Sequence, residues 1–187
     1  MYEYLNGKLI TKTPTHVVLD VGGIGYYIHI SLTTFTQLKD HEACKLYISF
    51  QVREDAQTLY GFATLGERQL FNHLISVSGI GPNTGRMMLS SITPEEIQTA
   101  ITHGQVNVIQ KIKGIGPKSA QRVILELQDK LKKDGPDALI PAISVKQSVS
   151  EEALSALIML GFGKPQAEKV LNSIPQSDEA ITVEQLI

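Results

Sequence analysis

The chain of 187 residues has no tryptophan and a single cysteine, Cys44. One cysteine excludes both a disulfide framework and a cysteine-based zinc site, and it is compatible with a reducing cytosol. The five histidines are scattered, without an H-E-x-x-H motif, so the sequence predicts no metal site. No apolar run approaches the roughly 20 residues of a membrane helix, and the first residues lack a signal-peptide pattern. We therefore expect a cytoplasmic protein without a membrane span.

The chain also lacks a strong excess of charge of one sign. It has 17 Lys and Arg against 19 Asp and Glu, which gives a net charge of −2. This total by itself does not indicate a nucleic-acid partner. The hydrophobic fraction of 42% is ordinary for a folded globular chain and too high for disorder. No G-x-x-x-x-G-K-[ST] motif occurs, so we expect no ATP hydrolysis by a P-loop mechanism.

Hydrophobic periodicity divides the chain into four segments. Residues 1–62 contain about five short alternating strands, such as 16–21, with the turn spacing of a small β-barrel. Residues 63–134 change to a helical period and predict an all-α unit. Residues 135–147 contain Gly and Pro and predict a flexible linker, and residues 148–187 predict three short helices. The predicted fold class is therefore α+β with several domains.

Counting charge by segment changes its meaning. The net charge is −1 for residues 1–62, +3 for 63–134 and −4 for 135–187. Such a basic run is usually only a solvated helix face, so it needs a second signal before it indicates a binding site. Seven basic residues of the middle segment gather near its end: Lys111, Lys113, Lys118, Arg122, Lys130, Lys132 and Lys133.

An internal repeat supplies the second signal. Residues 74–85 match residues 109–120 at a constant offset of 35, and each copy runs from an apolar helix end through Gly-Ile-Gly-Pro into a new helix. The glycines permit a tight turn or the close approach of another backbone. We expect Ile80 and Ile115 to fill the core between the helices. The backbone N–H groups at the next helix N-terminus would then remain exposed, and they favour an anion.

This pattern is that of the helix-hairpin-helix, a module that grips DNA phosphates without reading bases. A plain αα-hairpin turn is the alternative for one copy, but two copies beside basic residues favour phosphate binding. Because such contacts carry no sequence information, specificity must come from the shape of the nucleic acid. The candidate DNA-binding residues are Gly79, Gly81, Asn83, Thr84, Gly114, Gly116, Lys118, Ser119 and Arg122.

Two further motifs have an ordinary explanation. The glycine-rich residues 21–25 look like a phosphate loop but join two strand patterns, which favours a hairpin turn. The sequence Arg53-Glu54-Asp55 also lies between strand patterns and predicts a charged hairpin tip. Paired carboxylates can coordinate Mg²⁺ in a nuclease, but no third carboxylate is placed to complete a two-metal site.

Together these blocks resemble the RuvA family of Holliday-junction-binding subunits. The resemblance rests on V-R-E-D-A-Q at 52–57, L-Y-G-F at 59–62, the two hairpins and L-G-F at 160–162, and it covers essentially the whole chain. It implies an OB-fold first domain, a tandem helix-hairpin-helix second domain and a mobile, UBA-like third domain. The third domain would hold the hexameric ATPase RuvB through apolar positions such as Leu157, Leu160 and Phe162.

The resemblance also implies an assembly and a division of roles. The chain would form a homotetramer, with one or two tetramers on a four-way junction, and the resolvase RuvC is a further candidate partner. Glu54 and Asp55 would form an acidic pin at the centre. The chain would be non-catalytic and without a cofactor, since ATP and Mg²⁺ belong to the motor. It departs from the family pattern at Asn83, where a Lys is expected, so the first hairpin should depend more on backbone N–H groups and on Asn83 and Thr84.

Two other functions remain open from the residues alone. The chain could be a helix-hairpin-helix nuclease or glycosylase that uses Glu54 and Asp55 or another, unrecognised base, although no metal cluster accompanies them. It could also be a scaffold whose basic face binds RNA or a protein. For the apolar stripe at Leu157, Leu160 and Phe162, the alternative to a partner surface is the core of the small terminal module itself.

Overall fold

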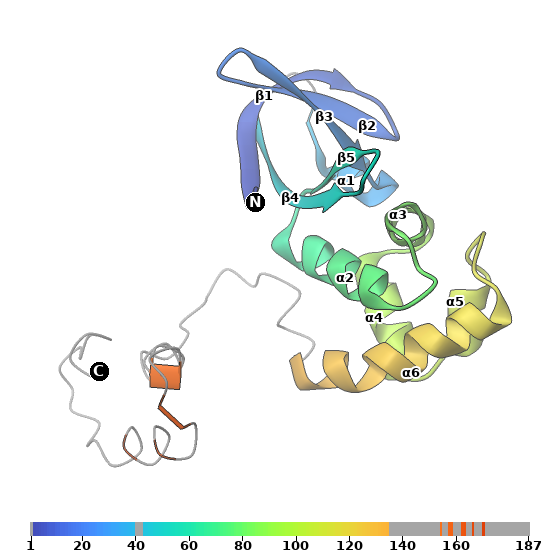
Figure 1. The fold of residues 1–187 in the computed structure, drawn as a ribbon. Helices are drawn as coiled ribbons and strands as arrows, with labels where there is room; N and C mark the ends of the chain where they lie inside the picture. Colours follow the sequence, from blue (N-terminus) through green and yellow to red (C-terminus); the bar gives the residue numbers. More distant parts are fainter. Residues whose placement is uncertain are drawn as a thin grey trace. The chain divides into compact units, whose positions relative to one another are not determined.

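The computed structural model describes residues 2–39, 43–134 and seven positions between 154 and 170. The chain divides into two compact units, Met1–Pro141 and Ala142–Ile187. Every helix and strand with described bounds lies in the first unit (Figure 1). The predicted linker 135–147 and most of the predicted terminal helices lie outside the described residues.

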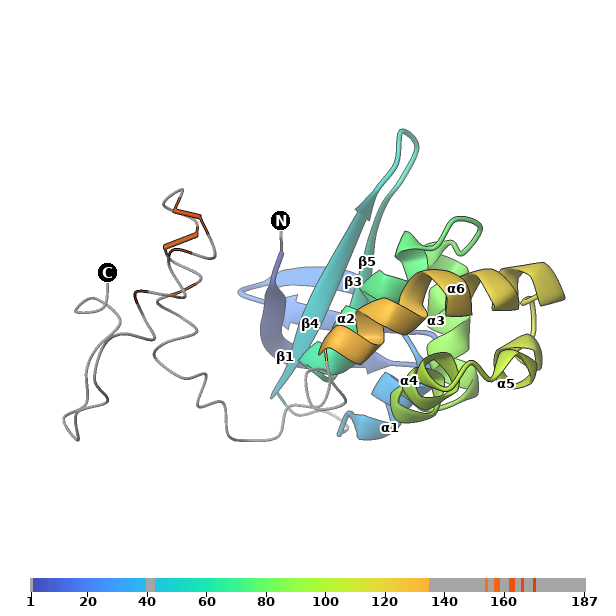
Figure 2. The ribbon, with the colours of Figure 1, turned by 90° about the horizontal axis from the view of Figure 1, so that it is seen from below.

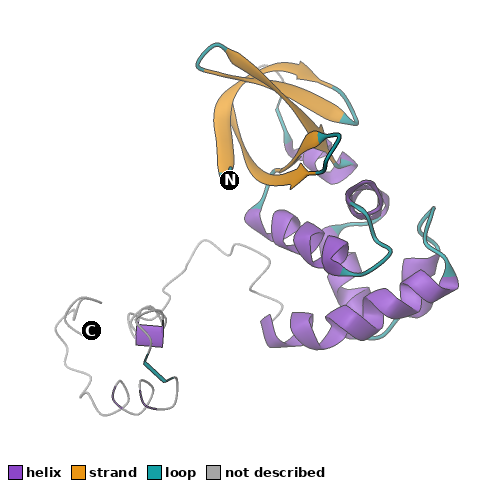
Figure 3. Cartoon of the chain, in the orientation of Figure 1, coloured by secondary structure: helices purple, strands orange, loops and turns teal. Residues whose placement is uncertain are grey.

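Five strands close into a barrel in the order β1-β2-β3-β5-β4 (Figure 3). All neighbours are antiparallel except β3 and β5, which pair in parallel and complete the closure. The inward face is apolar, with Val17, Leu19 and Ile28 fully buried, so period-two alternation produces the core. The small barrel predicted for this region is confirmed. Its strands are β1 (Tyr4–Lys12), β2 (His16–Val21), β3 (Ile24–Ile30), β4 (Ala43–Val52) and β5 (Gln57–Phe62).

The turn between β2 and β3 is a tight hairpin. Gly22 and Gly23 adopt φ values of 63° and 88°, a left-handed conformation that glycine accepts without a steric penalty. The carboxylate of Asp20 accepts a hydrogen bond from the Gly23 N–H at 2.9 Å. The hairpin interpretation of this glycine-rich segment is therefore confirmed.

A short helix, α1 (Leu32–Gln37), interrupts the barrel strands and was not predicted from the sequence. Its residues include three threonines, which have low helix propensity, so local preference gives little indication of a helix. The Ser31 side chain caps it by accepting a hydrogen bond from the Thr34 N–H at 2.9 Å. Tertiary contacts also hold it, since the Thr33 hydroxyl donates to the Leu89 carbonyl oxygen at 2.7 Å.

The segment after the barrel is helical, as predicted. Thr93 and Glu96 form a capping box at the start of α4. Within the described part of the chain, no helix has the length and apolar character needed to cross a membrane. The helices are α2 (Leu65–Ser76), α3 (Pro82–Ser91), α4 (Pro94–Thr102), α5 (Val106–Gln110) and α6 (Pro117–Asp134).

The barrel and the helices are joined by a buried polar junction. The Glu67 side chain is only 2% exposed and accepts hydrogen bonds from the hydroxyls of Ser31 and, at 2.7 Å, Thr34. Burial raises the pKa of this carboxyl group, and the two hydrogen bonds partly oppose the rise. Phe62, at the end of β5, packs in the same apolar cluster as Phe71 of α2. The first unit is therefore one body rather than two loosely tethered domains.

Candidate nucleic-acid interface

The two Gly-Ile-Gly-Pro hairpins have nearly the same backbone. Gly79 and Gly114 adopt φ values of 91° and 90°, in the left-handed region that favours glycine. The Ile80 N–H donates to the Val77 carbonyl at 3.0 Å, and the equivalent bond of Ile115 is also 3.0 Å. Both isoleucines are buried, at 4% and 6% exposure, as predicted. The sequence repeat is therefore a repeat of three-dimensional structure.

Each hairpin is followed by a helix, α3 or α6, whose first turn begins at the second glycine of the hairpin, Gly81 or Gly116. The N–H of Gly85 donates to the Gly81 carbonyl at 2.9 Å, and Ala120 donates to Gly116 over the same distance. Gly81 is the N-cap of α3 and no side chain caps that helix end. The N–H groups that a cap would satisfy are thus left for another acceptor, and the helix dipole favours a negative one.

The second glycine of each hairpin has no internal reason to be glycine. Gly81 has φ −82° and ψ 167°, values that any residue adopts. A Cβ atom added at Gly81 or Gly116 would meet nothing within 4 Å in the chain. The open space therefore lies in front of the helix N-terminus, where another backbone can approach closely.

The side chains around the two hairpins differ in charge. Lys113 and Lys118 are exposed beside the second hairpin, and Ser119, next to Lys118 in the first turn of α6, is half-buried. Arg122 is also exposed, but its Nε donates to a Glu126 carboxylate oxygen at 2.7 Å, so part of its charge is compensated.

Among the described residues, the first hairpin has no cation that is equally available. Asn83 is exposed and Thr84 is half-buried. The nearest basic residue, Arg86, directs its guanidinium toward the barrel and donates to the Ile30 carbonyl at 3.2 Å. This barrel-facing role of Arg86 was missed by sequence reasoning, because spacing along a helix does not say which neighbour a long side chain will find.

The charged tip is a hairpin between β4 and β5, as predicted. Val52 pairs with Gln57, and the Arg53 N–H donates to the Ala56 carbonyl at 2.8 Å to close the turn. Glu54 and Asp55 are exposed at its end. Figure 2 shows this hairpin standing out from the barrel. Among the described residues, no group of three or more His, Cys, Asp or Glu is arranged to hold a metal ion.

The structure describes part of the apolar stripe predicted in the terminal unit. Leu157 is buried at 8% exposure, whereas Phe162 is 56% exposed. The Phe162 N–H donates to the Leu157 carbonyl at 3.0 Å. Leu160 lies outside the described residues. Burial of Leu157 fits the alternative of a core position, and a role of the stripe in binding a partner stays a prediction.

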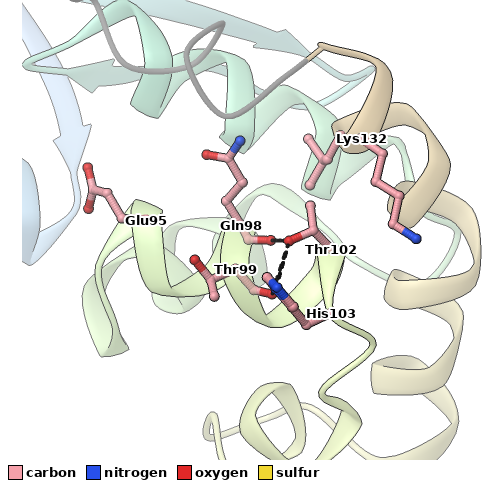
Figure 4. Close-up of a pocket in the computed structure, with 7 residues that line it drawn as sticks. Glu95, Gln98, Thr99, Thr102, His103 and Lys132 are labelled. Carbon is pink, nitrogen blue, oxygen red and sulfur yellow. Dashed lines mark hydrogen bonds between the residues drawn. The ribbon is translucent and has the colours of Figure 1, made fainter.

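A shallow pocket between α4 and the end of α6 contains none of the predicted site residues (Figure 4). Within α4, the Thr102 hydroxyl donates to the Gln98 carbonyl at 2.9 Å, and His103 Nδ1 lies 2.9 Å from the Thr99 carbonyl oxygen. Glu95 and Lys132 bring opposite charges to the lining, so the pocket has no net preference for a phosphate.

A closed five-stranded barrel joined to two hairpins, each with open space in front of the helix that follows, defines a helix-hairpin-helix protein with an OB-type domain. Comparison with known families agrees with this class. The family described as RuvA N terminal domain matches residues 1–61, SAM-like Helix-hairpin-helix tandem matches 71–129, and RuvA, C-terminal domain matches 148–187. The chain belongs to the RuvA family.

Curated relatives are similar over the full length. The Holliday junction branch migration complex subunit RuvA of Christiangramia forsetii is 52% identical over 188 residues, covering 100% of this chain and 96% of the relative. The protein of the same name from Cytophaga hutchinsonii is 51% identical over 195 residues, with the same coverage. That from Bacteroides fragilis is 42% identical over 196 residues, again covering 100% and 96%.

Proposed function

We propose that this chain is the non-catalytic DNA-binding subunit of a branch migration complex, which binds four-way junction DNA and holds it open. The observation that carries the proposal is the pair of equivalent hairpins, each with open space at the second glycine in front of the next helix, and with no side-chain cap at the start of α3. Two phosphate grips on one rigid body fix the direction of a DNA arm, whereas one grip fixes only a point.

The proposed assembly is a homotetramer, alone or paired with a second tetramer on the junction. A closed ring of four subunits matches the approximate fourfold symmetry of four DNA arms. Four copies of Glu54 and Asp55 at its centre would repel phosphates and favour an open, flat crossover in which strands separate and re-pair. The exposure of both carboxylates on a projecting tip supports this pin role.

The energy for branch migration would come from a partner. The sequence has no P-loop, so we propose that RuvB supplies ATP hydrolysis with its own Mg²⁺ and that this chain needs no cofactor. The exposed Phe162, together with Leu160 and Leu157, is proposed to contact that motor. RuvC is proposed as a further partner on the same junction during recombination and repair.

The glycines at the helix ends test the proposal directly. Gly116→Leu places a side chain where the phosphate would lie, and we expect junction affinity to fall at least about tenfold, since each charge-assisted hydrogen bond contributes about 1.5–3 kcal/mol. Gln121→Leu adds the same side chain to an exposed position of the same helix and should bind like the parent.

Fluorescence anisotropy at about 150 mM salt measures the affinity of the parent and of both variants for a four-way junction and for a linear duplex of equal length. Equal binding of the two DNAs by the parent contradicts junction specificity.

The pin is tested by removing its charge. Glu54→Gln combined with Asp55→Asn should leave junction affinity unchanged or raise it, because four repulsive pairs are removed, while branch migration with the motor is impaired. Gel-shift and strand-exchange assays on the same junction separate the two effects. A loss of junction binding would contradict the repulsive role.

A further inference from the structure

Four rings form a continuous row on the outer face of the barrel. His16 and Tyr27 stack with ring centroids 4.5 Å apart and an interplanar angle of 19°. Tyr27 meets His29 edge-on at 5.2 Å, and His29 lies 5.6 Å from Tyr60. Strand register places them, because His16 pairs with His29 across β2 and β3, and His29 pairs with Tyr60 across β3 and β5. We call these four residues the aromatic row.

The aromatic row is anchored at one end and open at the other. Tyr60 is 7% exposed and its ring lies 5.2 Å from Phe71 in the helical core. Tyr27 is 50% exposed. At the open end, the Thr13 hydroxyl lies 2.9 Å from His16 Nδ1 and holds the imidazole in place. The exposed rings are therefore preorganised, and a ligand that stacks on them loses little side-chain entropy in the protein.

The charges that act on the aromatic row are mainly positive. Arg86 lies close enough to lower the pKa of His29, although burial is the larger cause of that shift. Burial raises the pKa of Tyr60, and the nearby charges of Arg86 and Arg53 partly oppose that rise. The acidic residue on the same face of β2 is Asp20, whose carboxylate already accepts the Gly23 N–H. Rings with two arginines nearby suit an aromatic ligand that carries phosphate.

We propose that the aromatic row binds unpaired bases of single-stranded DNA, with a base stacked on Tyr27. The faces of strands 2 and 3 are where OB-folds bind oligonucleotides, and aromatic side chains accept any base because every base has a π-face. The proposal deepens the proposed function, on which it rests for the source of the single strand. Tyr60 lies three residues along β5 from Gln57 at the pin hairpin, about 10 Å in an extended strand. A strand that separates at the pin would thus reach the row at once.

The experiment uses the full chain and a fluorescein-labelled oligo(dT) of about 15 nucleotides, a length in the range that one OB-fold covers. Tyr27→Ala should weaken oligo(dT) binding about tenfold or more, and Tyr27→Phe should restore it, because stacking needs the ring and not the hydroxyl. Tyr4→Ala is the matched control, since Tyr4 is also 50% exposed on a barrel strand but packs under Lys45, 4.0 Å from its ring. It should bind like the parent.

A sealed, immobile four-way junction serves as the second probe for the same proteins. Tyr27→Ala should bind this junction like the parent, because the hairpins hold its paired arms. Gly116→Leu should lose junction affinity. When Tyr27→Ala is added to Gly116→Leu, oligo(dT) binding should fall by the same factor as in the parent chain. A failure of the proposed function therefore appears as lost junction specificity in the parent, and a failure of the aromatic row appears on oligo(dT) alone.

Three results would overturn the proposal for the aromatic row. The first is a parent chain that does not bind oligo(dT), and the second is an equal loss in Tyr27→Ala and Tyr4→Ala. The third is a change of oligomeric mass in Tyr27→Ala by native mass spectrometry, which would mean that a second copy of the chain covers the row.

Discussion

The hairpin between α2 and α3 and the hairpin between α5 and α6 share a backbone but differ in the charges around it. Their left-handed glycines agree within 1° in φ, and their first-turn hydrogen bonds are both 2.9 Å long. The second hairpin has exposed Lys113 and Lys118, whereas the first has Asn83 and an arginine that faces the barrel. The comparison teaches that the two hairpins share a main-chain geometry that does not depend on the charges beside it, so in the proposed phosphate site charge is a separate addition.

The reason for the difference lies in the neighbours of each hairpin. The first is followed by α3, which packs against α1 and the barrel, so its basic residue is used as a structural donor to Ile30. The second is followed by α6, whose exposed face is free to carry charge at Lys118 and Arg122. We therefore expect the first hairpin to set geometry and the second to supply most of the salt-dependent attraction.

The largest effect should come from the shared core of the hairpins. Ile80→Ala and Ile115→Ala each remove a buried side chain from the same apolar cluster, and each should cost about 2–4 kcal/mol of unfolding free energy. Urea denaturation followed by circular dichroism measures both. The comparison predicts that the two costs agree within about 1 kcal/mol, closer than the spread of roughly 2 kcal/mol that one substitution type shows at different buried sites. A much smaller cost at Ile115 would show that the second hairpin is not packed like the first.

An exchange of charge between the hairpins should have the next largest effect. Log affinity falls with log salt; Lys118→Asn should make this fall shallower by about one unit of slope, and Asn83→Lys should make it steeper by about one, as for one phosphate contact. The measurement is junction binding over a range of salt concentrations. Lys8→Asn, at an exposed site on β1, removes the same charge from the barrel as a control. If Asn83→Lys leaves the slope unchanged, the first hairpin does not face a phosphate.

The smallest effect should come from releasing Arg122. Glu126→Gln breaks the i, i+4 pair, which is worth only about 0.3–0.5 kcal/mol in an exposed helix, and makes the guanidinium fully available. Junction affinity should rise about twofold at low salt and converge with the parent at high salt. Glu95→Gln removes an equal charge from α4 and should not reproduce the rise. An identical gain in both variants would point to net charge rather than to Arg122.

The sequence was sufficient for the parts of the fold that local patterns control. The offset repeat led directly to both hairpins, and alternation led to the barrel strands, because each depends on residues close in the chain. The sequence did not predict helix α1, because its threonines disfavour a helix and packing on α3 stabilises it. Local patterns also did not predict the parallel pairing of β3 with β5, because they do not encode a partner about 30 residues away.

The polar junction was harder to see than the hairpins. Thr64 and Glu67 form a T-x-x-E signal that predicts a helix start at α2, and the Thr64 side chain does cap that helix. The signal does not say that Glu67 will be buried under Ser31 and Thr34, 33 residues or more away in sequence. Burial of a carboxylate depends on how two elements meet, which propensity and capping rules do not address.

The same junction makes the first unit stiff in a mechanical sense. Only Ala63 and Thr64 separate β5 from α2, and the Ala63 N–H itself donates to the Thr34 hydroxyl at 3.3 Å. A load applied at the hairpins of the helical region therefore meets no hinge before it reaches the strand that bears the Glu54 and Asp55 tip. If the hairpins bind DNA arms as proposed, the barrel and its helices would act together as a lever, and rotation of a bound arm would reach the crossover as torque.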